Sequence, residues 1–578
     1  MIPIQKIKEI IQGEVSSSES DLEKYSHDAS VFEIMPQAVV HPKNVEDLKA
    51  LVKMVSAEKS RDPSLSLTAR SAGTDMSGGA INDSLILDFT THFNKILDVS
   101  TADPILLDYK KLLKEHTGTG VANLNIAGLQ HGDGSAVVQP GVFYRDFEKV
   151  ALEQNLLLPC YTASKTINTL GGMAANNSAG EKSLSYGQTK DYVEYIRAVM
   201  SDGNEYMFHQ LSDHELQEKM KLPNFEGQLY RKMYDLVKQN YGLIMGSKPT
   251  TSKNSSGYLL WEVWNKVYFN LAKLLVGSQG TLGLITEIKY KLVKPKKFSE
   301  LLVIFMNESK ELGDLIDVVL KYKPESFESF DNHTFNLAIK FMPEMIRHMK
   351  GNAFSLGLKF LPELWMALTG GMPKLILIAE FTGDNHAEII PRIMSAKREM
   401  EARFKIKTHI TKDAEESEKY WTVRRESFNL LRQHTTGRHT APFIDDIVVH
   451  PHDLPQFLPR LDAILAKYPQ LIYTIAGHMG DANFHIIPLM DLANPKEREI
   501  IPPLSEEVYK LVLEYKGSIT AEHNDGLIRT PYLEKMYGAS MVKLFTQVKQ
   551  IFDPLNIFNP RKKVGGTIRY AMSHMRTK

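Results

Sequence analysis

TLGGMAANNSAGEKSLSYGQTKDYV, residues 169–193, is a long run rich in small and amide-bearing residues. Its first half contains the adjacent Gly171 and Gly172 and ends at Gly180. Backbone with so little side chain can lie against a flat aromatic ring, while Asn and Ser side chains hydrogen-bond the edge of the ring. A purely structural turn explains such a run equally well, so its interpretation depends on the rest of the chain.

Two further glycine loops flank this run in the sequence. ARSAGTDMSGGA occupies residues 69–80, and GSQGTLGLITE occupies residues 277–287. Consecutive backbone amides among small residues can form a concave nest for a phosphate. The first loop lacks the GK[ST] ending of a P-loop and is not G-x-G-x-x-G. Each loop alone is compatible with a tight turn, but three in order favour one shared binding function.

The pattern of predicted strands, helices and glycine loops changes once along the chain. Up to about Pro295, glycine loops alternate with β-type runs such as residues 84–89 and 283–293, and residues 45–60 form an amphipathic helical pattern. Later runs, ELLVIFM and LILIAEF, are followed by helical patterns over 415–432 and 453–467. The predicted parts are an N-terminal helical segment, a mixed α/β domain with a polar insertion, a sheet covered by helices, and a C-terminal helical segment: 1–35, 36–297 (insertion about 101–136), 298–500 and 501–578.

Composition narrows the classes of function. Lys+Arg and Asp+Glu both number 69, so the formal net charge is zero and no nucleic-acid partner is expected. The single cysteine, Cys160, cannot form a disulfide framework or an iron–sulfur cluster, which favours a reducing, cytoplasmic location. A redox enzyme with this sequence would therefore pass its electrons to a separate acceptor.

Hydrophobic patterning predicts no secretion or membrane insertion. The first fifteen residues form a short amphipathic helical pattern without the apolar core of a signal peptide. No uninterrupted apolar stretch approaches the ~18 residues of a transmembrane helix. The most apolar segment, residues 354–380, is interrupted by charged residues and proline, and we interpret it as a buried cap helix rather than a membrane-surface helix.

Two polar motifs near the C-terminus suggest a metal site. GHMGDANFH, residues 477–485, places His478 and His485 seven residues apart around a turn, so that a hairpin would bring both imidazoles to one ion. TAEHNDGLIR, residues 520–529, adds Glu522 and His523. Two histidines and one carboxylate suit a borderline divalent cation with an open position for substrate. From spacing alone, buried histidines without an ion explain the pattern equally well.

Together the three glycine loops resemble the FAD-binding domain of the vanillyl-alcohol oxidase (PCMH-type) family, and the resemblance extends from about Pro36 to Lys563. It implies an α+β fold: a two-subdomain PCMH-type FAD-binding domain, an α/β cap domain for substrate and a helical C-terminal segment. It implies FAD bound non-covalently, because the first loop has neither His nor Cys. The residues placed against the cofactor are Arg70, Gly73, Thr74, Asp75, Met76, Ser77, Gly78, Thr169, Gly171, Gly172, Asn176, Ser178, Gly180, Gly280 and Ile285.

The histidine motifs, together with FDPLNIFNPRKK at residues 552–563, resemble the D-lactate, D-2-hydroxyglutarate and glycolate dehydrogenase branch of that family. The resemblance implies that His478, His485 and Glu522 bind a divalent metal such as zinc, iron or manganese, and that His523 is the base. It also implies that Arg424, in YWTVRRESFNLLR, binds the substrate carboxylate. The expected reaction is oxidation of a small D-2-hydroxy acid by hydride transfer to flavin N5.

Several residues depart from the family pattern. Gln279 replaces a glutamate in the third loop, while Ala482 and Asn524 stand where glycine is usual. A positive φ at Ala482 would cost ~1 kcal/mol, whereas Asn tolerates that region better. The segment 443–451 lacks the lysine that 2-hydroxyglutarate dehydrogenases carry, which favours lactate or glycolate as substrate.

Partners and alternatives follow from the same residues. The chain ends without a cysteine-rich domain, so a quinone, cytochrome, flavoprotein or iron–sulfur subunit is the expected electron acceptor, and a homodimer or peripheral attachment to the inner face of a membrane is compatible with the sequence. A non-redox transferase resembling alkyl-dihydroxyacetone-phosphate synthase, and a catalytically silent FAD or metal module, remain alternatives. A Rossmann dehydrogenase is rejected because Asn123 breaks the pattern that Gly118 and Gly120 begin. No G-x-S-x-G motif supports a hydrolase.

Overall fold

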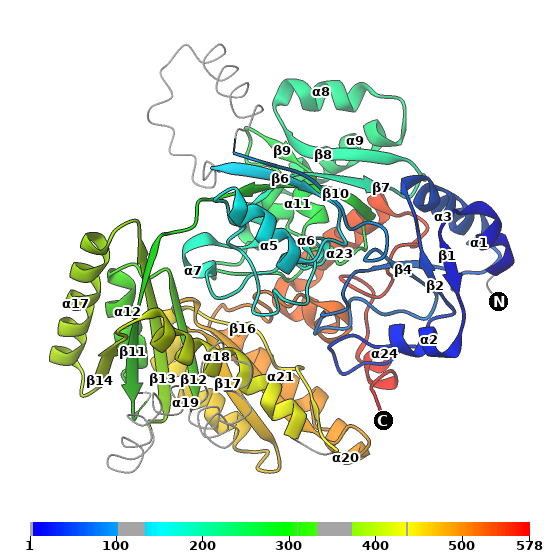
Figure 1. Ribbon diagram of the computed structural model, residues 1–578. Coiled ribbons are helices and arrows are strands. Elements are labelled where there is room, and N and C mark those ends of the chain that lie inside the picture. Colours follow the sequence, from blue (N-terminus) through cyan, green and yellow to red (C-terminus); the bar gives the residue numbers. More distant parts are fainter. Residues whose placement is uncertain (1–3, 102–132, 309, 332–372, 435–436, 578) are drawn as a thin grey trace.

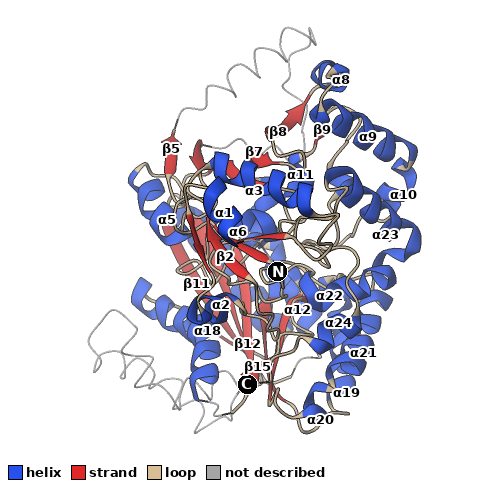
Figure 2. Ribbon diagram, turned by 90° about the vertical axis from the view of Figure 1, so that its right-hand side faces the viewer, coloured by secondary structure: helices blue, strands red, loops and turns tan. Residues whose placement is uncertain are grey.

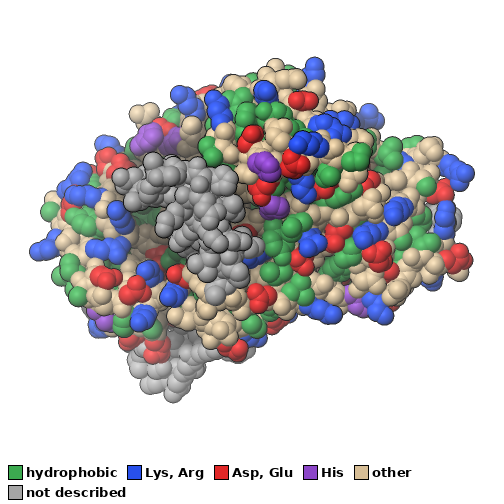
Figure 3. Space-filling model, turned by 90° about the horizontal axis from the view of Figure 1, so that it is seen from above, with side chains coloured by type: hydrophobic (Ala, Val, Ile, Leu, Met, Phe, Trp, Pro, Cys, Tyr) green, Lys and Arg blue, Asp and Glu red, His purple; other side chains and the backbone are tan. Residues whose placement is uncertain are grey.

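The computed structural model describes residues 4–101, 133–308, 310–331, 373–434 and 437–577. Two domains are stacked in Figure 1, with the N-terminal domain above and the cap domain at lower left. Within the described residues no helix combines the length and apolarity needed to cross a membrane. On the face seen in Figure 3, acidic and basic side chains are mixed over the surface, in keeping with the zero net charge.

The first sheet of the N-terminal domain has four strands in the order β1-β2-β4-β3. Strands β2 (Ala38–His41) and β3 (Leu67–Arg70) pair in parallel with β4 (Leu85–Asp88), and β1 (Glu14–Ser16) is antiparallel to β2. The predicted helix is α3 (Val45–Glu58); it begins at Asn44, whose side chain accepts a hydrogen bond from the Asp47 amide. Its buried face packs on this sheet. The predicted N-terminal helix is α1 (Ile4–Ile10).

The second sheet of this domain is antiparallel and has the order β5-β6-β10-β7-β8-β9. Its longest strand, β10, is the β-type run predicted from the third glycine loop. The C-terminal end of the expected insertion, residues 134–136, belongs to β6, and residues 102–132 lie outside the described chain. The strands are β5 (Ile96–Ser100), β6 (Gly134–Val138), β7 (Val193–Val199), β8 (Glu205–Leu211), β9 (Phe269–Asn270) and β10 (Leu284–Leu292).

The cap domain is one antiparallel sheet in the order β14-β11-β13-β12-β17-β18-β15, with β16 paired to β18. Both predicted runs are strands, β11 (Phe298–Met306) and β13 (Leu375–Gly383). The expected cap helix over 354–380 is therefore wrong at its end, where 375–380 forms part of β13, and residues 354–372 lie outside the described chain. The other strands are β12 (Ser326–Asp331), β14 (Lys407–Ile410), β15 (His439–Thr440), β16 (Ile447–Val448), β17 (Ile472–His478) and β18 (Asn483–Met490).

Helices cover both faces of the cap sheet. Successive residues of β11 point to opposite faces and are buried on both. Leu302 and Ile304 pack with helices α12 (Leu312–Lys321), α17 (His386–Arg403), α19 (Leu454–Leu465) and α21 (Ile501–Glu514). Leu301 and Val303 pack on the other face with Tyr420 and Trp421 of α18 (Ala414–His434). The predicted helical patterns at 415–432 and 453–467 correspond to α18 and α19, and the predicted helical segment 501–578 begins with α21.

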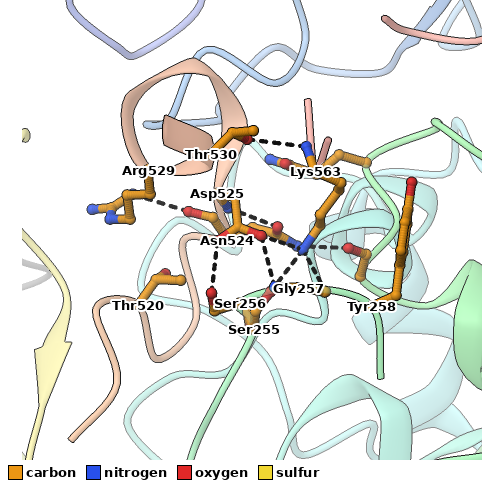
Figure 4. A network of polar contacts seen from close by, with 12 residues as sticks. Ser255, Ser256, Gly257, Tyr258, Thr520, Asn524, Asp525, Arg529, Thr530 and Lys563 are labelled. Atoms are coloured by element: carbon orange, nitrogen blue, oxygen red, sulfur yellow. Dashed lines mark hydrogen bonds and ion pairs between the residues drawn. The ribbon is translucent and has the colours of Figure 1, made fainter. Parts of the chain in front are cut away.

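The last part of the chain is not a separate helical segment, because it divides between the two domains. Helix α21 packs on α19 of the cap, whereas α23 (Leu533–Phe552) lies beside α9 (Phe225–Gln239) of the N-terminal domain (Figure 2). Beyond α23, the buried Lys563 ammonium donates to Ser255 O, Gly257 O and Asp525 Oδ2, each at 2.8 Å (Figure 4). This ion pair ties the chain end to the N-terminal domain and to the segment that follows His523.

Candidate active site

A cavity of about 1240 Å³ lies between the glycine loops of the N-terminal domain and the strands and helix α18 of the cap. Its volume exceeds that of an ordinary small-molecule site and suits a dinucleotide together with a small substrate. Most residues predicted to bind the cofactor line it: Arg70, Gly73, Thr74, Asp75, Met76, Thr169, Gly171, Gly172, Asn176, Ser178, Gly280 and Ile285.

Three residues predicted to bind the cofactor are not among the lining residues. Ser77 is buried beneath its loop, and its hydroxyl donates to Asp75. A Cβ at Gly78 would lie 2.6 Å from the Phe32 ring, and a Cβ at Gly180 would overlap the Tyr161 carbonyl oxygen. These positions shape the loops through close packing instead of facing the cavity.

Asp75 turns its carboxylate back into the first loop. The carboxylate accepts hydrogen bonds from the amides of Ser77 at 3.1 Å and Gly79 at 2.5 Å, and from the Asn176 side chain at 3.0 Å. Within the described chain, the amides of Gly73, Thr74 and Met76 have no acceptor. Those three amides line the cavity and fit a diphosphate, whereas the Asp75 side chain orders the loop.

Gln279 joins the three glycine loops to the second histidine motif. Its Nε2 donates to Ser77 Oγ at 3.0 Å and to Asn176 Oδ1 at 3.3 Å, and its Oε1 accepts from the Gly526 amide at 2.8 Å. Asn524 has a φ of 69° and donates through Nδ2 to the carbonyl oxygens of Asn176 and Gly277. The expected left-handed conformation and hydrogen-bonding roles of these two departures are confirmed.

Sequence reasoning missed two stretches of the cavity wall. His27, Asp28 and Ala29 line it from the N-terminal segment, and residues 161–168 line it beside the second loop. The Ala29 amide donates to the Asp75 carbonyl oxygen, which holds the N-terminal segment against the first loop. The polar run YTASKTIN was visible in the sequence, but nothing in residues 27–29 distinguishes them from an ordinary turn.

The first histidine motif is the hairpin that its spacing predicted. His478 ends β17, residues 479–481 form a short turn, and His485 lies in β18, opposite Ala476. Ala482 has a φ of 51°, so this alanine adopts the left-handed conformation that favours glycine. The turn brings both imidazoles to the same face of the cap sheet.

Three imidazoles converge on one carboxylate oxygen. Glu522 Oε1 lies 3.1 Å from His478 Nε2, 3.4 Å from His485 Nε2 and 3.8 Å from His523 Nε2. These are the three predicted metal ligands and the predicted base. The structure therefore brings together residues that are separated by up to 45 positions in the chain.

A buried carboxylate lies beside the far nitrogen of each imidazole, and it forms a hydrogen bond with that of His478 and of His485. Glu328 Oε1 lies 2.6 Å from His478 Nδ1, and Asp445 lies 3.0 Å from His485 Nδ1 and 2.6 Å from His523 Nδ1. Such carboxylate–histidine contacts fix the tautomer and orient Nε2 toward a metal. Neither Glu328 nor Asp445 was predicted, because neither belongs to a motif that marks it as a partner of a histidine far away in the sequence.

Asp446 offers a second grouping of metal-type ligands with His485, Glu522 and His523, whose ligand atoms lie within 4.8 Å of one another. The Asp446 carboxylate already accepts from the Asn483 side chain, the Thr520 hydroxyl and the amides of Glu522 and His523. Four donors leave it little capacity for an ion. Asp446 therefore positions the second motif, and His478, His485 and Glu522 form the alternative donor set.

The cluster carries an excess of negative charge when its imidazoles are neutral. Lys253 is buried and lies 3.3 Å from both Glu522 and Asp481, while buried Arg529 donates to the carbonyl oxygens of Asn524 and Asp445. A deficit of two positive charges suits a divalent cation. The five carboxylates are Glu328, Asp445, Asp446, Asp481 and Glu522, and the three permanent cations are Lys253, Arg424 and Arg529.

The pKa values of the histidines and of Glu522 reflect the same balance of charges. Burial lowers the pKa of His478 and His485, but the adjacent carboxylates outweigh burial and raise the pKa of each to about 9. Burial raises the pKa of Glu522, yet Lys253 and His478 hold that pKa well below its usual range. Positive charge is thus strongly favoured between these side chains, whether it is carried by protons or by a metal ion.

The two arginines of α18 both line the cavity but have different partners. Arg424 donates from Nε to Glu328 Oε2 at 3.2 Å, and its Nη2 lies 3.2 Å from the same oxygen. Arg425 forms two hydrogen bonds with Glu181, at 3.1 and 2.7 Å. Arg424 is therefore the arginine beside the histidine cluster, and among the residues that the structure describes, partners use only one edge of its guanidinium.

Comparison with protein families accounts for both domains. Residues 36–107 and 113–207 match the FAD binding domain, and residues 308–563 match the C-terminal domain of FAD linked oxidases. The chain belongs to the FAD-linked oxidases. The family assignment confirms the predicted PCMH-type fold and FAD as cofactor, and it accounts for a cavity shared between glycine loops and cap.

Relatives within this family include 2-hydroxy-acid enzymes. The chain is 24% identical to a D-2-hydroxyglutarate dehydrogenase of Pseudomonas putida over 95% of its own length, but it spans only 50% of that protein. It is 25% identical to the glycolate oxidase subunit GlcD of Bacillus subtilis (93% and 91% covered) and to a D-lactate dehydrogenase of Anaerostipes hadrus (97% and 96% covered). The chain thus spans about half the length of the first of these relatives.

Solved structures support the fold alone. An alkyldihydroxyacetonephosphate synthase superposes with a TM-score of 0.63 at 13% identity, covering 97% of this chain and 85% of that one. A p-cresol methylhydroxylase superposes with a TM-score of 0.64 at 15% identity, covering 98% and 96%. At such identities the shared architecture does not transfer chemistry.

FAD affinity is expected to fall as the pH rises through neutrality, because of Asp28. Burial, and then Asp75, raise the pKa of Asp28 to about 7. Below that pH the carboxyl is neutral, and above it the carboxyl adds a negative charge to the cavity that would receive the diphosphate. Arg70 is the facing cation, and Lys562, whose pKa burial lowers to about 7, loses its charge over the same range. One like charge at 4 Å costs about 1 kcal/mol in water, or about fivefold in affinity.

Flavin fluorescence quenching at a series of pH values would measure this effect. Asp28→Asn is the matched variant, and its FAD dissociation constant should depend on pH less steeply than that of the wild type across the same range, with Lys562 as the remaining group that titrates there. A wild-type affinity without pH dependence, or an Asn variant that keeps the dependence, would contradict the assignment.

Proposed function

We propose that this protein oxidises a small D-2-hydroxy acid of the lactate or glycolate type and transfers a hydride to the N5 atom of non-covalently bound FAD. The observation that carries the proposal is the convergence of three imidazole Nε2 atoms on Glu522 Oε1, in the same cavity as the flavin-loop residues. His478, His485 and Glu522 would hold a divalent cation such as zinc, iron or manganese, for which imidazole and carboxylate are suitable donors.

Different residues of the chain would bind the substrate and accept its proton. Arg424 would bind the substrate carboxylate with the guanidinium edge that Glu328 does not use. His523 would accept the hydroxyl proton at Nε2, because its Nδ1 lies 2.6 Å from Asp445. Asp445 would stabilise the resulting imidazolium. When bound, the cation would acidify the hydroxyl, and FAD would supply the two-electron acceptor.

Electrons would leave through an external acceptor, such as a quinone, a cytochrome, a flavoprotein or an iron–sulfur subunit. Cys160 is buried and does not line the cavity, so it offers no redox route. A cytoplasmic location, peripheral contact with a membrane and a homodimer are part of the same proposal.

Anaerobic titration of the FAD-loaded protein with a panel of D- and L-2-hydroxy acids tests the proposal directly. Bleaching of the flavin absorbance by a D-acid, and not by its L-enantiomer, is the expected result. Prior treatment with a chelator should abolish bleaching, and added Zn²⁺ or Mn²⁺ should restore it. A flavin that no 2-hydroxy acid reduces would overturn the proposal and favour a non-redox transferase.

A further inference from the structure

The cavity continues beyond the histidines along one face of the cap sheet. His478, Ala476 and Thr474 alternate along β17 and all line the cavity. On β18, His485 pairs with Ala476, and Ile487 pairs with Thr474. Two adjacent rows of side chains therefore run from the histidines into the cap, and successive members of a row are about 7 Å apart.

These rows are uncharged after the histidines. Ala476 also pairs with Phe330 of β12, which packs in the apolar layer with Tyr420 and Trp421. Thr440 of β15 adds a further uncharged lining residue. On β17 the row continues to Ile472, which is 52% exposed, so the apolar face extends from the buried cluster to the surface.

On its other sides, the histidine cluster is bordered by polar groups that already have partners. The Arg424–Glu328 pair lies on one side of the cluster, and the Lys253–Glu522 pair closes another. The glycine loops face the cluster from the N-terminal domain. Within the part of the chain that the structure describes, every lysine or arginine lining the cavity already has an acceptor. These pairs are Arg70 with Tyr25 O, Lys165 with Glu148, Arg424 with Glu328 and Arg425 with Glu181.

We propose that the C2 substituent of the substrate lies along Ala476, Thr474 and Ile487, and that the preferred substrates are D-2-hydroxy acids with an uncharged, aliphatic substituent longer than methyl. The inference rests on the proposed function and extends it. A methyl group would occupy only the space next to the histidines and Ala476, whereas a branched four-carbon substituent would extend from Ala476 toward Thr474 and Ile487. A second carboxylate would enter an apolar wall with no unpaired cation among the described lining residues.

Steady-state kinetics with an artificial electron acceptor test the inference on the FAD- and metal-loaded enzyme. The series is D-lactate, D-2-hydroxybutyrate, D-2-hydroxyisocaproate and D-2-hydroxyglutarate. We expect kcat/KM to rise about threefold to fourfold for each methylene buried, the factor that corresponds to its transfer free energy. D-2-Hydroxyglutarate should be a poorer substrate than D-2-hydroxyisocaproate.

Two variants test whether the row formed by Ala476, Thr474 and Ile487 causes this substrate preference. Ala476→Leu should lower the ratio of kcat/KM for D-2-hydroxyisocaproate over D-lactate by at least about tenfold, because it fills the space with the volume of the substituent. Ile487→Arg should raise kcat/KM for D-2-hydroxyglutarate relative to D-lactate, since it supplies the missing cation. Ile475→Leu, on the opposite face of the same strand, is the matched control and should leave both ratios unchanged.

The outcomes separate this inference from the proposed function. If D-lactate and D-2-hydroxyglutarate reduce the flavin but longer aliphatic acids do not, the proposed function stands and the aliphatic wall is wrong. If the Ala476→Leu and Ile475→Leu variants give the same ratios, the substituent lies elsewhere. If no 2-hydroxy acid reacts, both proposals fail together.

Discussion

A Glu522→Gln variant is expected to lose its bound divalent metal and more than about 100-fold in kcat/KM. Changes to residues that only orient metal ligands cost 10–100-fold, and Glu522 contributes the oxygen on which all three imidazoles converge. Glutamine preserves shape and hydrogen bonding but removes the charge. Elemental analysis of the purified protein, normalised to its flavin absorbance, measures the metal in correctly folded molecules.

Two histidine variants distinguish the two groupings of ligands around Glu522. His478→Gln should lose the metal, whereas His523→Gln should keep it and slow flavin reduction by about 10²–10⁴-fold, the usual contribution of a general base. The reverse result, with metal lost from His523→Gln and kept by His478→Gln, would establish the grouping that includes Asp446. Thermal unfolding of each variant controls for misfolding, because Glu328 and Asp445 would lose buried partners.

Local chemistry in the sequence predicted much of the site. The glycine loops, the hairpin between His478 and His485, and the left-handed backbone at Ala482 all depend on residues close together in the chain. Gln279 was recognised as a hydrogen-bonding replacement, and it does bond to two of the loops and to Gly526. Such features carry their own sequence signature because backbone geometry restricts the residue types.

Partners from distant segments could not be predicted in the same way. Glu328 lies 150 positions from His478, and Lys253 lies 269 positions from Glu522. Each is one charged residue in a strand or loop, where a solvent-exposed role is the usual expectation. The Asp445–Asp446 pair has no sequence signature of its own, although its carboxylates contact both histidine motifs.

The sequence also did not indicate which domain each helix of the C-terminal segment packs against, because these helices are amphipathic in either case. Helix α21 packs on the cap, while α23 and the residues after it complete the N-terminal domain. Between them lies the segment that carries Glu522 and His523. The candidate metal site is therefore held from both sides, and contacts far from the cavity should influence it.

Lys563→Met is expected to destabilise the protein by about 3–5 kcal/mol, the usual cost of breaking a buried ion pair. Lys563 and Asp525 are both fully buried, and Asp525 also accepts from the Ser256 hydroxyl and the Gly257 amide (Figure 4). Removing the ammonium leaves Asp525 charged without its cation, two residues from His523. Denaturant unfolding of the FAD-bound protein, followed by flavin fluorescence and by circular dichroism, measures the loss.

Lys562→Met is the matched control for this prediction. Lys562 is also buried, but it donates to the Ile81 carbonyl oxygen, and burial lowers its pKa to about 7, so replacing it leaves no carboxylate unpaired. Its cost should be about 1–3 kcal/mol, the penalty for one unsatisfied acceptor. Combining Lys563→Met with Asp525→Asn should recover part of the lost stability, because the uncompensated charge is removed. Equal losses for the two lysine variants, or no recovery in the double variant, would mean that packing rather than the ion pair joins the C-terminal segment to the site.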